Sequence, residues 1–250
     1  MSRPGGEDVL FGRRPVLAAL QSERPVHRLL LLRGGRGDVV DGIRARARRL
    51  GVPVDERDRP ALDRAAGGGN HQGVVALLAA RSYADFEQVL SGAREAGFLV
   101  FLDGIQDPHN LGAILRTAHA LGADAAVIPR RGGAGLTSTA AKAAAGAAEQ
   151  LPLCRVANLR QSLTRARGAG LWVTGLDAAA GRSFDSLDFT GPGALVVGAE
   201  GRGLRPLVRQ SCDFIARIPM GREQAGSMNA SVAAGIALYE VFRQRRGGRP

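Results

Sequence analysis

The stretch FLVFLDGIQDPHNLGAILRTA, residues 98–118, joins five apolar residues to a turn and an apolar helical pattern. The run Phe98–Leu102 predicts a buried strand, and Pro108 and Asn110 are typical of a helix start. Two later stretches have the same form: LVVGAEGRGL, residues 195–204, and IPMGREQAGSMNASVA, residues 218–233. Open parallel sheets bind ligands at the carboxyl ends of their strands, so the three turns predict one common site.

Strand and helix signals alternate along the rest of the chain, which predicts two α/β domains. We expect a small domain over residues 1–80, a polar linker over 81–97 and a larger domain over 98–250. In the larger domain, parallel strands should alternate with crossover helices. The expected strands are 98–102, 125–128, 151–153, 171–174, 194–197 and 214–218, and the expected helices are 111–121, 137–148, 159–168, 204–210 and 231–244.

The composition indicates a folded, strongly basic protein. Of the 250 residues, 45% are hydrophobic, and the formal net charge is +11. Lys142 is the only lysine among the 34 basic residues, so arginine carries the charge, and arginine can bind phosphate through two N–H groups. This charge is consistent with a nucleic-acid partner and equally with a solvated surface. No apolar run would span a bilayer and no signal peptide is evident, so we expect a cytoplasmic protein without a membrane partner.

The cysteines and histidines do not indicate a metal site. Cys154 and Cys212 lack metal-type or CxxC spacing, and we expect both to be reduced and buried. His71 lies in the turn Asn70–Gly73 and is a candidate for a contact with RNA. The other histidines are expected to be structural: His27, His109 and His119.

The loop Gly198–Gly203, GAEGRG, carries the most specific chemistry. It matches neither GxGxxG nor a Walker A loop. Phosphate loops use amide donors and a cation, whereas this loop presents the carboxylate of Glu200. An acidic loop suits a cationic cofactor such as S-adenosyl-L-methionine, which has sulfonium and ammonium groups. By itself, the loop is also consistent with a simple turn whose Glu caps a helix.

The other two motifs leave structural alternatives open. Asn110 can be a helix N-cap or a site residue. Arg116 lies in an otherwise apolar helix, where an arginine usually has an anionic partner such as phosphate. Because six residues separate them, the two share one end of the helix only if the chain curls. Ser227, Asn229 and Ser231 can either cap the last helix or hold the polar part of a ligand.

In this order, the three motifs resemble those of the SpoU (TrmH-like) RNA 2'-O-ribose methyltransferases of the SPOUT class, over roughly residues 98–246. The segments FGRRPVLAAL, residues 11–20, and NHQGVVA, residues 70–76, resemble the ribosomal-protein-L30e-like substrate-binding domain of the 23S rRNA branch. The layout is most similar to enzymes that methylate a guanosine of the 23S rRNA peptidyl-transferase P loop. The tRNA guanosine-18 branch, which typically lacks the front domain, is the alternative. This chain has SMNAS where the family usually has SLNVS, and its loop at 221–226 is about one residue longer.

The resemblance implies S-adenosyl-L-methionine as cofactor, a deep trefoil knot in the larger α/β domain, a homodimer, and RNA, with rRNA expected, as substrate. Arg116 would lie at the reacting ribose. Because a guanidinium keeps its protons, we expect it to clamp the adjacent phosphate, with Glu200 a candidate base or ribose-binding group. A non-catalytic RNA-binding protein is the main alternative, and a dehydrogenase is disfavoured by the glycine spacing. The catalytic residues implied are Asn110, Arg116, Glu200, Ser227 and Asn229, and the cofactor-binding residues are Gly198, Glu200, Gly201, Ile218, Met220, Met228 and Asn229.

Overall fold

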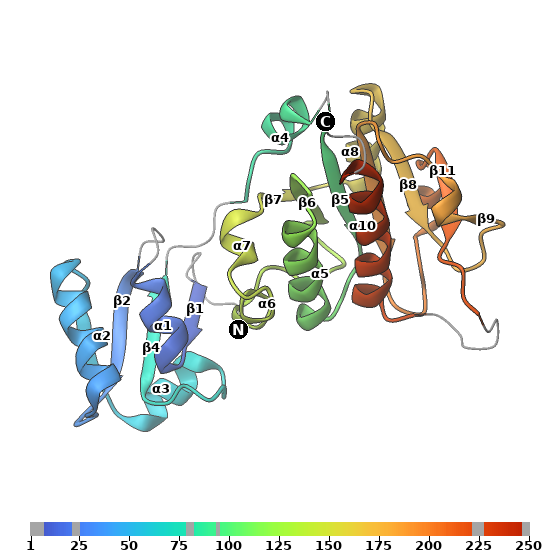
Figure 1. Cartoon of the computed structure of the whole chain (residues 1–250). Coiled ribbons are helices and arrows are strands. Elements are labelled where there is room, and N and C mark those ends of the chain that lie inside the picture. The colour runs from blue at the N-terminus through green and yellow to red at the C-terminus, as the bar shows by residue number, and fades with distance from the viewer. Residues whose placement is uncertain (1–7, 22–25, 79–82, 94–95, 222–227, 247–250) are drawn as a thin grey trace. The chain divides into compact units, whose positions relative to one another are not determined.

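The computed structural model describes residues 8–21, 26–78, 83–93, 96–221 and 228–246, and its contacts divide the chain into two compact units (Figure 1). The first unit is Met1–Ser82 and the second is Tyr83–Pro250. No helix in these described ranges is long and apolar enough to cross a membrane.

The first unit is a small α/β domain with a mixed four-stranded sheet, in the strand order β1-β4-β2-β3. Strand β4 is antiparallel to both β1 and β2, whereas β2 and β3 are parallel. Helices α1 and α2 pack on one face of the sheet and α3 packs on the other. The strands are β1 (Asp8–Phe11), β2 (Val26–Leu32), β3 (Val54–Arg57) and β4 (Val74–Leu78), and the helices are α1 (Arg13–Ala19), α2 (Asp38–Arg49) and α3 (Arg59–Ala66).

The sequence of this unit explains its helices. In α2, Val40, Ile43 and Ala47 are buried at a helical spacing, while the arginines are exposed or half-buried. Helix α3 begins where the Asp58 carboxylate accepts the Ala61 N–H at 3.0 Å, and it ends at Gly67 in the left-handed conformation. The unit is therefore held by ordinary caps and one-sided apolar faces.

The second unit has a seven-stranded sheet in the order β7-β6-β5-β10-β8-β11-β9, in which all paired strands run parallel. This confirms the predicted α/β class with a parallel sheet in the larger domain. The strands are β5 (Phe98–Asp103), β6 (Ala125–Pro129), β7 (Leu153–Val156), β8 (Trp172–Leu176), β9 (Arg182–Ser183), β10 (Gly193–Gly198) and β11 (Phe214–Arg217). The helices are α4 (Phe86–Gly92), α5 (Pro108–Ala120), α6 (Ser138–Ala143), α7 (Ala147–Gln150), α8 (Leu159–Gly168), α9 (Pro206–Arg209) and α10 (Ala230–Arg246).

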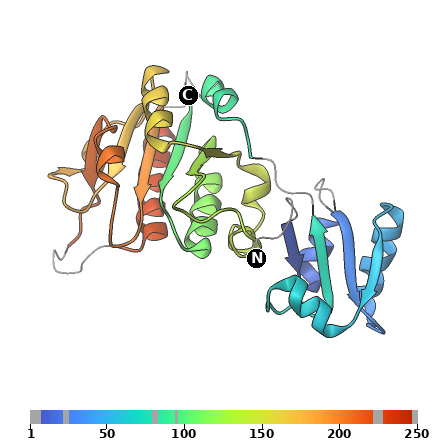
Figure 2. The same ribbon diagram turned by 180° about the vertical axis from the view of Figure 1, so that it is seen from behind.

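Helices cover both faces of this sheet, as the two opposite views show (Figures 1 and 2). Helices α5, α6 and α10 pack on one face, and α4, α8 and α9 pack on the other. The central strand β5 is buried along its whole length. Its side chains alternate, so that Val100 and Leu102 join the first layer whereas Leu99 and Phe101 join the second. Because β5 and β10 are paired in parallel, their carboxyl ends are neighbours at one edge of the sheet.

Two predicted elements of the second unit differ from the observed ones. The single helix expected over 137–148 is divided into α6 and α7, because Ala145 and Gly146 adopt left-handed φ angles of 48° and 94°. The strand expected at 151–153 begins only at Leu153. Both differences lie away from the three turns.

The segment expected to be a linker contributes to the second unit over its described part. Ala84 forms a parallel bridge with Cys154 of β7. Phe86 and Leu90 of α4 are buried in the core with α8. The expected trefoil knot stays a prediction, because residues 222–227, between β11 and α10, lie outside the described residues.

Candidate functional site

Three polar side chains from the three motifs meet at the carboxyl edge of the sheet. The Asn110 amide Nδ2 donates to Glu200 Oε1 at 3.1 Å, and Asn229 Nδ2 donates to Asn110 Oδ1 at 3.1 Å. Asn229 Nδ2 also donates to Glu200 Oε1, and the Ala230 N–H reaches the same oxygen at 3.3 Å. We name Asn110, Glu200 and Asn229 the amide–carboxylate cluster. It joins residues that are 90 and 119 positions apart in the chain.

Asn110 is not a helix cap. The cap of α5 is Asp107, whose Oδ1 accepts the His109 N–H at 2.9 Å. Asn110 is the third residue of the helix and only 8% exposed. Its amide is therefore free to bind Glu200, and burial makes that bond costly to lose.

Asn229 does two things at once. Its Oδ1 accepts from the N–H and the Oγ–H of Ser231, at 2.9 and 2.6 Å, and from the Val232 N–H at 3.3 Å. This is N-terminal capping of α10. Because the oxygen is used for the cap, the Nδ2 group is turned toward Asn110 and Glu200.

The glycines around Glu200 make its turn possible. Ala199 and Gly203 exchange two backbone hydrogen bonds, of 3.2 and 2.8 Å, and Gly201 has a left-handed φ of 70°. A Cβ on Gly198 would lie 2.2 Å from the carbonyl carbon of Gly203. The loop can therefore close only without a side chain at Gly198.

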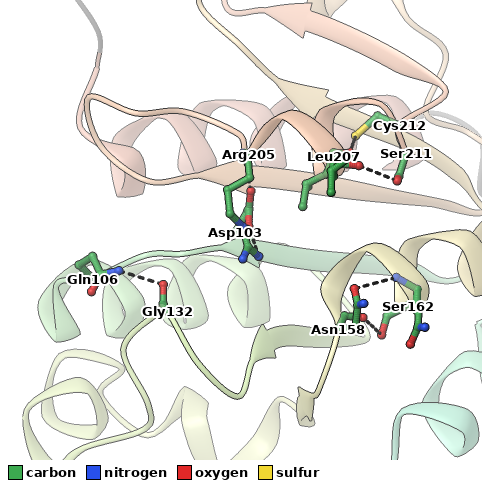
Figure 3. A network of polar contacts seen from close by, with 11 residues as sticks. Asp103, Gln106, Gly132, Asn158, Ser162, Arg205, Leu207, Ser211 and Cys212 are labelled. Carbon is green, nitrogen blue, oxygen red and sulfur yellow. Dashed lines mark hydrogen bonds and ion pairs between the residues drawn. The ribbon is translucent and has the colours of Figure 1, made fainter.

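An ion pair between buried Asp103 and half-exposed Arg205 fixes this loop to the neighbouring strand (Figure 3). Asp103, at the end of β5, is 1% exposed. Its Oδ2 accepts the Arg205 backbone N–H at 2.8 Å, and its Oδ1 accepts from Nε and Nη2 of the same arginine, each at 2.6 Å. The pairing was not predicted, although a lone aspartate ending an apolar run was a visible signal.

A cavity of about 270 Å³ opens beside the cluster. It is lined by Leu176, Val197 and Ala230, and by six of the predicted cofactor residues: Gly198, Glu200, Gly201, Ile218, Met220 and Met228. Its size is near the lower end for ligand pockets. Its walls are mostly apolar or glycine, and its charged lining residues are Glu200, Asp177 and Arg202.

The segment Asp177–Ala179 also lines the cavity, and sequence reasoning missed it. A hydrogen bond from the Arg209 guanidinium, together with one from the Ala179 N–H, holds the pKa of Asp177 below its usual value. The signal was available in principle, because β8 is the neighbour of β10 and its carboxyl end reaches the same edge.

Two predicted residues are not part of the cluster. Arg116 is exposed on α5 and makes no hydrogen bond or ion pair within the described ranges. Since α5 is regular, six residues place Arg116 about 9 Å along the axis from Asn110, so the chain does not curl to bring them to one end. Ser227 lies outside the described residues.

Comparison with known proteins assigns both units. Residues 97–239 match the SpoU rRNA Methylase family, and residues 9–84 match the RNA 2'-O ribose methyltransferase substrate binding family. A candidate TrmH family tRNA/rRNA methyltransferase of Bacillus subtilis (strain 168), YacO, is 41% identical over 95% of this chain and 96% of its own.

Solved structures agree with these matches. The SpoU methyltransferase AviRb from Streptomyces viridochromogenes, in complex with the cofactor AdoMet, has a TM-score of 0.83 and 28% identity, covering 98% of this chain and 92% of that one. An AdoMet-bound rRNA methyltransferase from Sinorhizobium meliloti has a TM-score of 0.77 and 26% identity, covering 98% and 88%. With motifs, fold and both units in agreement, this chain belongs to the SpoU rRNA methylase family, and its front unit is the substrate-binding domain that accompanies RNA 2'-O-ribose methyltransferases.

Proposed function

We propose that this protein transfers a methyl group from S-adenosyl-L-methionine to the ribose 2'-hydroxyl of a guanosine in 23S rRNA, in the peptidyl-transferase P loop. The observation that carries the proposal is the amide–carboxylate cluster at the rim of an apolar cavity. The family supports the reaction class, and the solved relatives with AdoMet support the cofactor.

The cavity fits this cofactor by its chemistry. Apolar side chains such as Ile218 and Met220 suit the adenine ring, and the glycine loop allows close approach of backbone groups. The carboxylates of Glu200 and Asp177 suit cationic sulfonium and ammonium groups. When bound, the cofactor supplies a methyl group on a positively charged sulfur. We propose that Gly198, Glu200, Gly201, Ile218, Met220, Met228 and Asn229 hold it.

The cluster suggests how Glu200 would act. Its Oε1 already accepts three N–H groups, whereas its Oε2 has no partner among the described residues. We propose that Oε2 takes the proton of the ribose hydroxyl, with Asn110 and Asn229 fixing the carboxylate. Holding the reactants in line would supply the larger effect, up to about 7–11 kcal/mol.

Arg116 is proposed as a phosphate clamp rather than a base. A guanidinium does not lose its proton in proteins, but it binds phosphate through two N–H groups. Its exposed position on α5, without a partner in the described part of the chain, leaves it available to RNA. Ser227 is proposed to position the target nucleotide, on sequence grounds alone.

The substrate is tested by methyl transfer from labelled S-adenosyl-L-methionine to unmodified 23S rRNA and, in parallel, to bulk tRNA. We expect label at one 23S guanosine, mapped by the resistance of the 2'-O-methylated linkage to alkali. Label in tRNA alone would keep the chemistry but overturn the rRNA assignment. Absence of both transfer and cofactor binding would favour a plain RNA-binding protein.

We also propose a homodimer that buries one face of α10. Val232, Ile236 and Tyr239 are 52%, 43% and 57% exposed and follow each other at helical spacing. Exposed apolar side chains on one helix face are typical of an interface. Tyr239→Glu should shift the protein from dimer to monomer in sedimentation equilibrium, whereas Trp172→Glu, at another exposed aromatic, should not. A monomeric wild type would refute the proposal.

A further inference from the structure

The first unit contains a polar cavity that the proposed site does not use. It has a volume of about 670 Å³, within the range of pockets that bind small molecules. Helix α3, the start of α1 and the turn before β4 form its walls. Its polar side chains are Arg13, Arg59, Asp63, Asn70, His71 and Gln72. We name it the front pocket.

Hydrogen bonds fix one wall of the front pocket in advance of any ligand. His71 is only 5% exposed, and its Nδ1 accepts the Gly73 N–H at 2.9 Å. Because Nδ1 accepts, a neutral ring carries its proton on Nε2, which lies 3.0 Å from Asp63 Oδ1 and donates to it. The buried histidine therefore orients the carboxylate of Asp63, whose side chain is 54% exposed.

Two arginines, Arg13 and Arg59, also line the front pocket. The Arg13 side chain is anchored by its Nε–H, which donates to the Gln72 backbone oxygen at 3.2 Å. That bond leaves the terminal N–H groups of Arg13 available. Arg59 lies one turn before Asp63 on α3, and in the described part of the chain it has no hydrogen bond or ion pair.

The turn that carries His71 is conformationally unusual. Gln72 has a left-handed φ of 50°, which is rare for a residue with a long side chain. Its Oε1 accepts the Arg13 backbone N–H at 3.3 Å, and this hydrogen bond links the turn to the first residue of α1. Such backbone strain is more common at ligand sites than elsewhere.

We infer that the front pocket takes one unpaired guanosine nucleotide of the RNA substrate, an inference that rests on the proposed function. A nucleotide carries an anionic phosphate, which suits Arg13 and Arg59. Among the bases, guanine presents two adjacent N–H donors on its pairing edge, and the Asp63 carboxylate can accept both. Unpaired bases are the part of an RNA that side chains can read in this way.

The test is fluorescence anisotropy of the full-length protein with labelled uridine dodecamers at one fixed salt concentration. The dodecamers carry a single central guanosine, inosine or adenosine. We expect the guanosine dodecamer to bind about fivefold or more tighter than the adenosine one. Inosine lacks the 2-amino group, so its dodecamer should bind with intermediate affinity. Because only the RNA differs among these three measurements, a change in protein folding cannot account for the result.

Three variants assign the effect to the pocket. Asp63→Asn keeps the shape and should bring the guanosine and adenosine affinities within twofold of each other. Arg59→Gln should weaken both dodecamers equally, whereas Arg49→Gln, which removes the same charge at the end of α2, should weaken either one less. No guanosine preference in the wild type, or a preference that survives Asp63→Asn in a folded variant, would overturn the inference.

Two further measurements separate this inference from others. Tighter binding of free guanosine 5'-monophosphate than of the dodecamer would overturn an RNA site in favour of a free nucleotide. Affinity for S-adenosyl-L-methionine, measured by calorimetry, should be the same in Asp63→Asn and the wild type. If the wild type does not bind S-adenosyl-L-methionine, the proposed function is refuted, whereas a measured guanosine preference would still support the inference about the front pocket.

Discussion

Replacing Glu200 in two different ways should separate the structural part of the amide–carboxylate cluster from its chemistry. Glu200→Ala removes the oxygen that accepts Asn110 Nδ2 and Asn229 Nδ2. Asn229 is exposed and can donate to water instead. Asn110 is 8% exposed, so its amide is left unpaired in the interior, which costs about 1–3 kcal/mol. The N–H of Ala230, a residue only 4% exposed, loses the same acceptor, which it reaches at 3.3 Å.

Glu200→Gln keeps an acceptor oxygen at the position of Oε1. We therefore expect it to lower the free energy of unfolding by less than about 1 kcal/mol, since only the charge of the acceptor is lost. It replaces Oε2 with an amide, which cannot take a proton. Methyl transfer should then be lost although the fold is retained.

The stability of the second unit can be followed separately. Trp172, the only tryptophan of the chain, lies in β8, so its fluorescence during urea unfolding reports on this unit. The two transitions need not coincide in a chain of two units. An unchanged midpoint in Glu200→Ala, or equal losses in the two variants, would show that the acceptor oxygen does not carry the energy. Normal turnover in Glu200→Gln would exclude Glu200 as the base.

Three further predictions follow from particular atoms. Gly198→Ala should lose most cofactor affinity in calorimetry and about 1–3 kcal/mol of stability, because its Cβ would lie 2.2 Å from the Gly203 backbone, whereas Gly191→Ala has open space and should change neither. Arg116→Ala should abolish methyl transfer with cofactor affinity unchanged, and Arg160→Ala, at an exposed position on α8, should preserve both; an active Arg116→Ala would contradict the clamp. Burial raises the pKa of the Cys154 thiol from 9.0 to about 11 and that of the Cys212 thiol to about 12. Above pH 9 the thiols therefore lose protons in the unfolded state but not in the folded one, which favours unfolding. The urea midpoint should fall as the pH rises above 9. The double variant Cys154→Ala, Cys212→Ala should show a shallower fall, and an equal slope would contradict these pKa values.

Local signals predicted those parts of the fold that depend on local physics. The run FLVFL predicted β5 because five consecutive apolar residues bounded by turn signals favour a strand buried on both faces. Helix α8 was predicted with its observed bounds, since Asn158 caps it and Leu159, Leu163 and Ala166 keep a helical spacing. Elements of this kind are specified by their own residues.

What could not be predicted depended on contacts between distant residues or on a backbone conformation that has no sequence signature. The left-handed φ of Ala145 divides an alanine-rich run that otherwise fits one helix. Asp107 and Asn110 are both suitable caps, and only the structure shows that Asp107 fills that role. The partner of Asp103 is 102 residues away, in a loop whose sequence gives no hint of it.

The structure also determines how variants at the site must be interpreted. Asn229 caps α10 with its amide oxygen and binds Glu200 with its amide nitrogen, and Asn110 is a buried part of α5 that binds both Glu200 and Asn229, so removal of either changes both fold and site. Asn110→Ala would leave Glu200 with fewer donors and α5 with a small cavity, and loss of turnover alone would then say nothing about chemistry. Glu200 is different, because its two oxygens have separate surroundings. The comparison of Glu200→Gln with Glu200→Ala is therefore the one substitution pair in the cluster that can tell a positioned base from a structural tether.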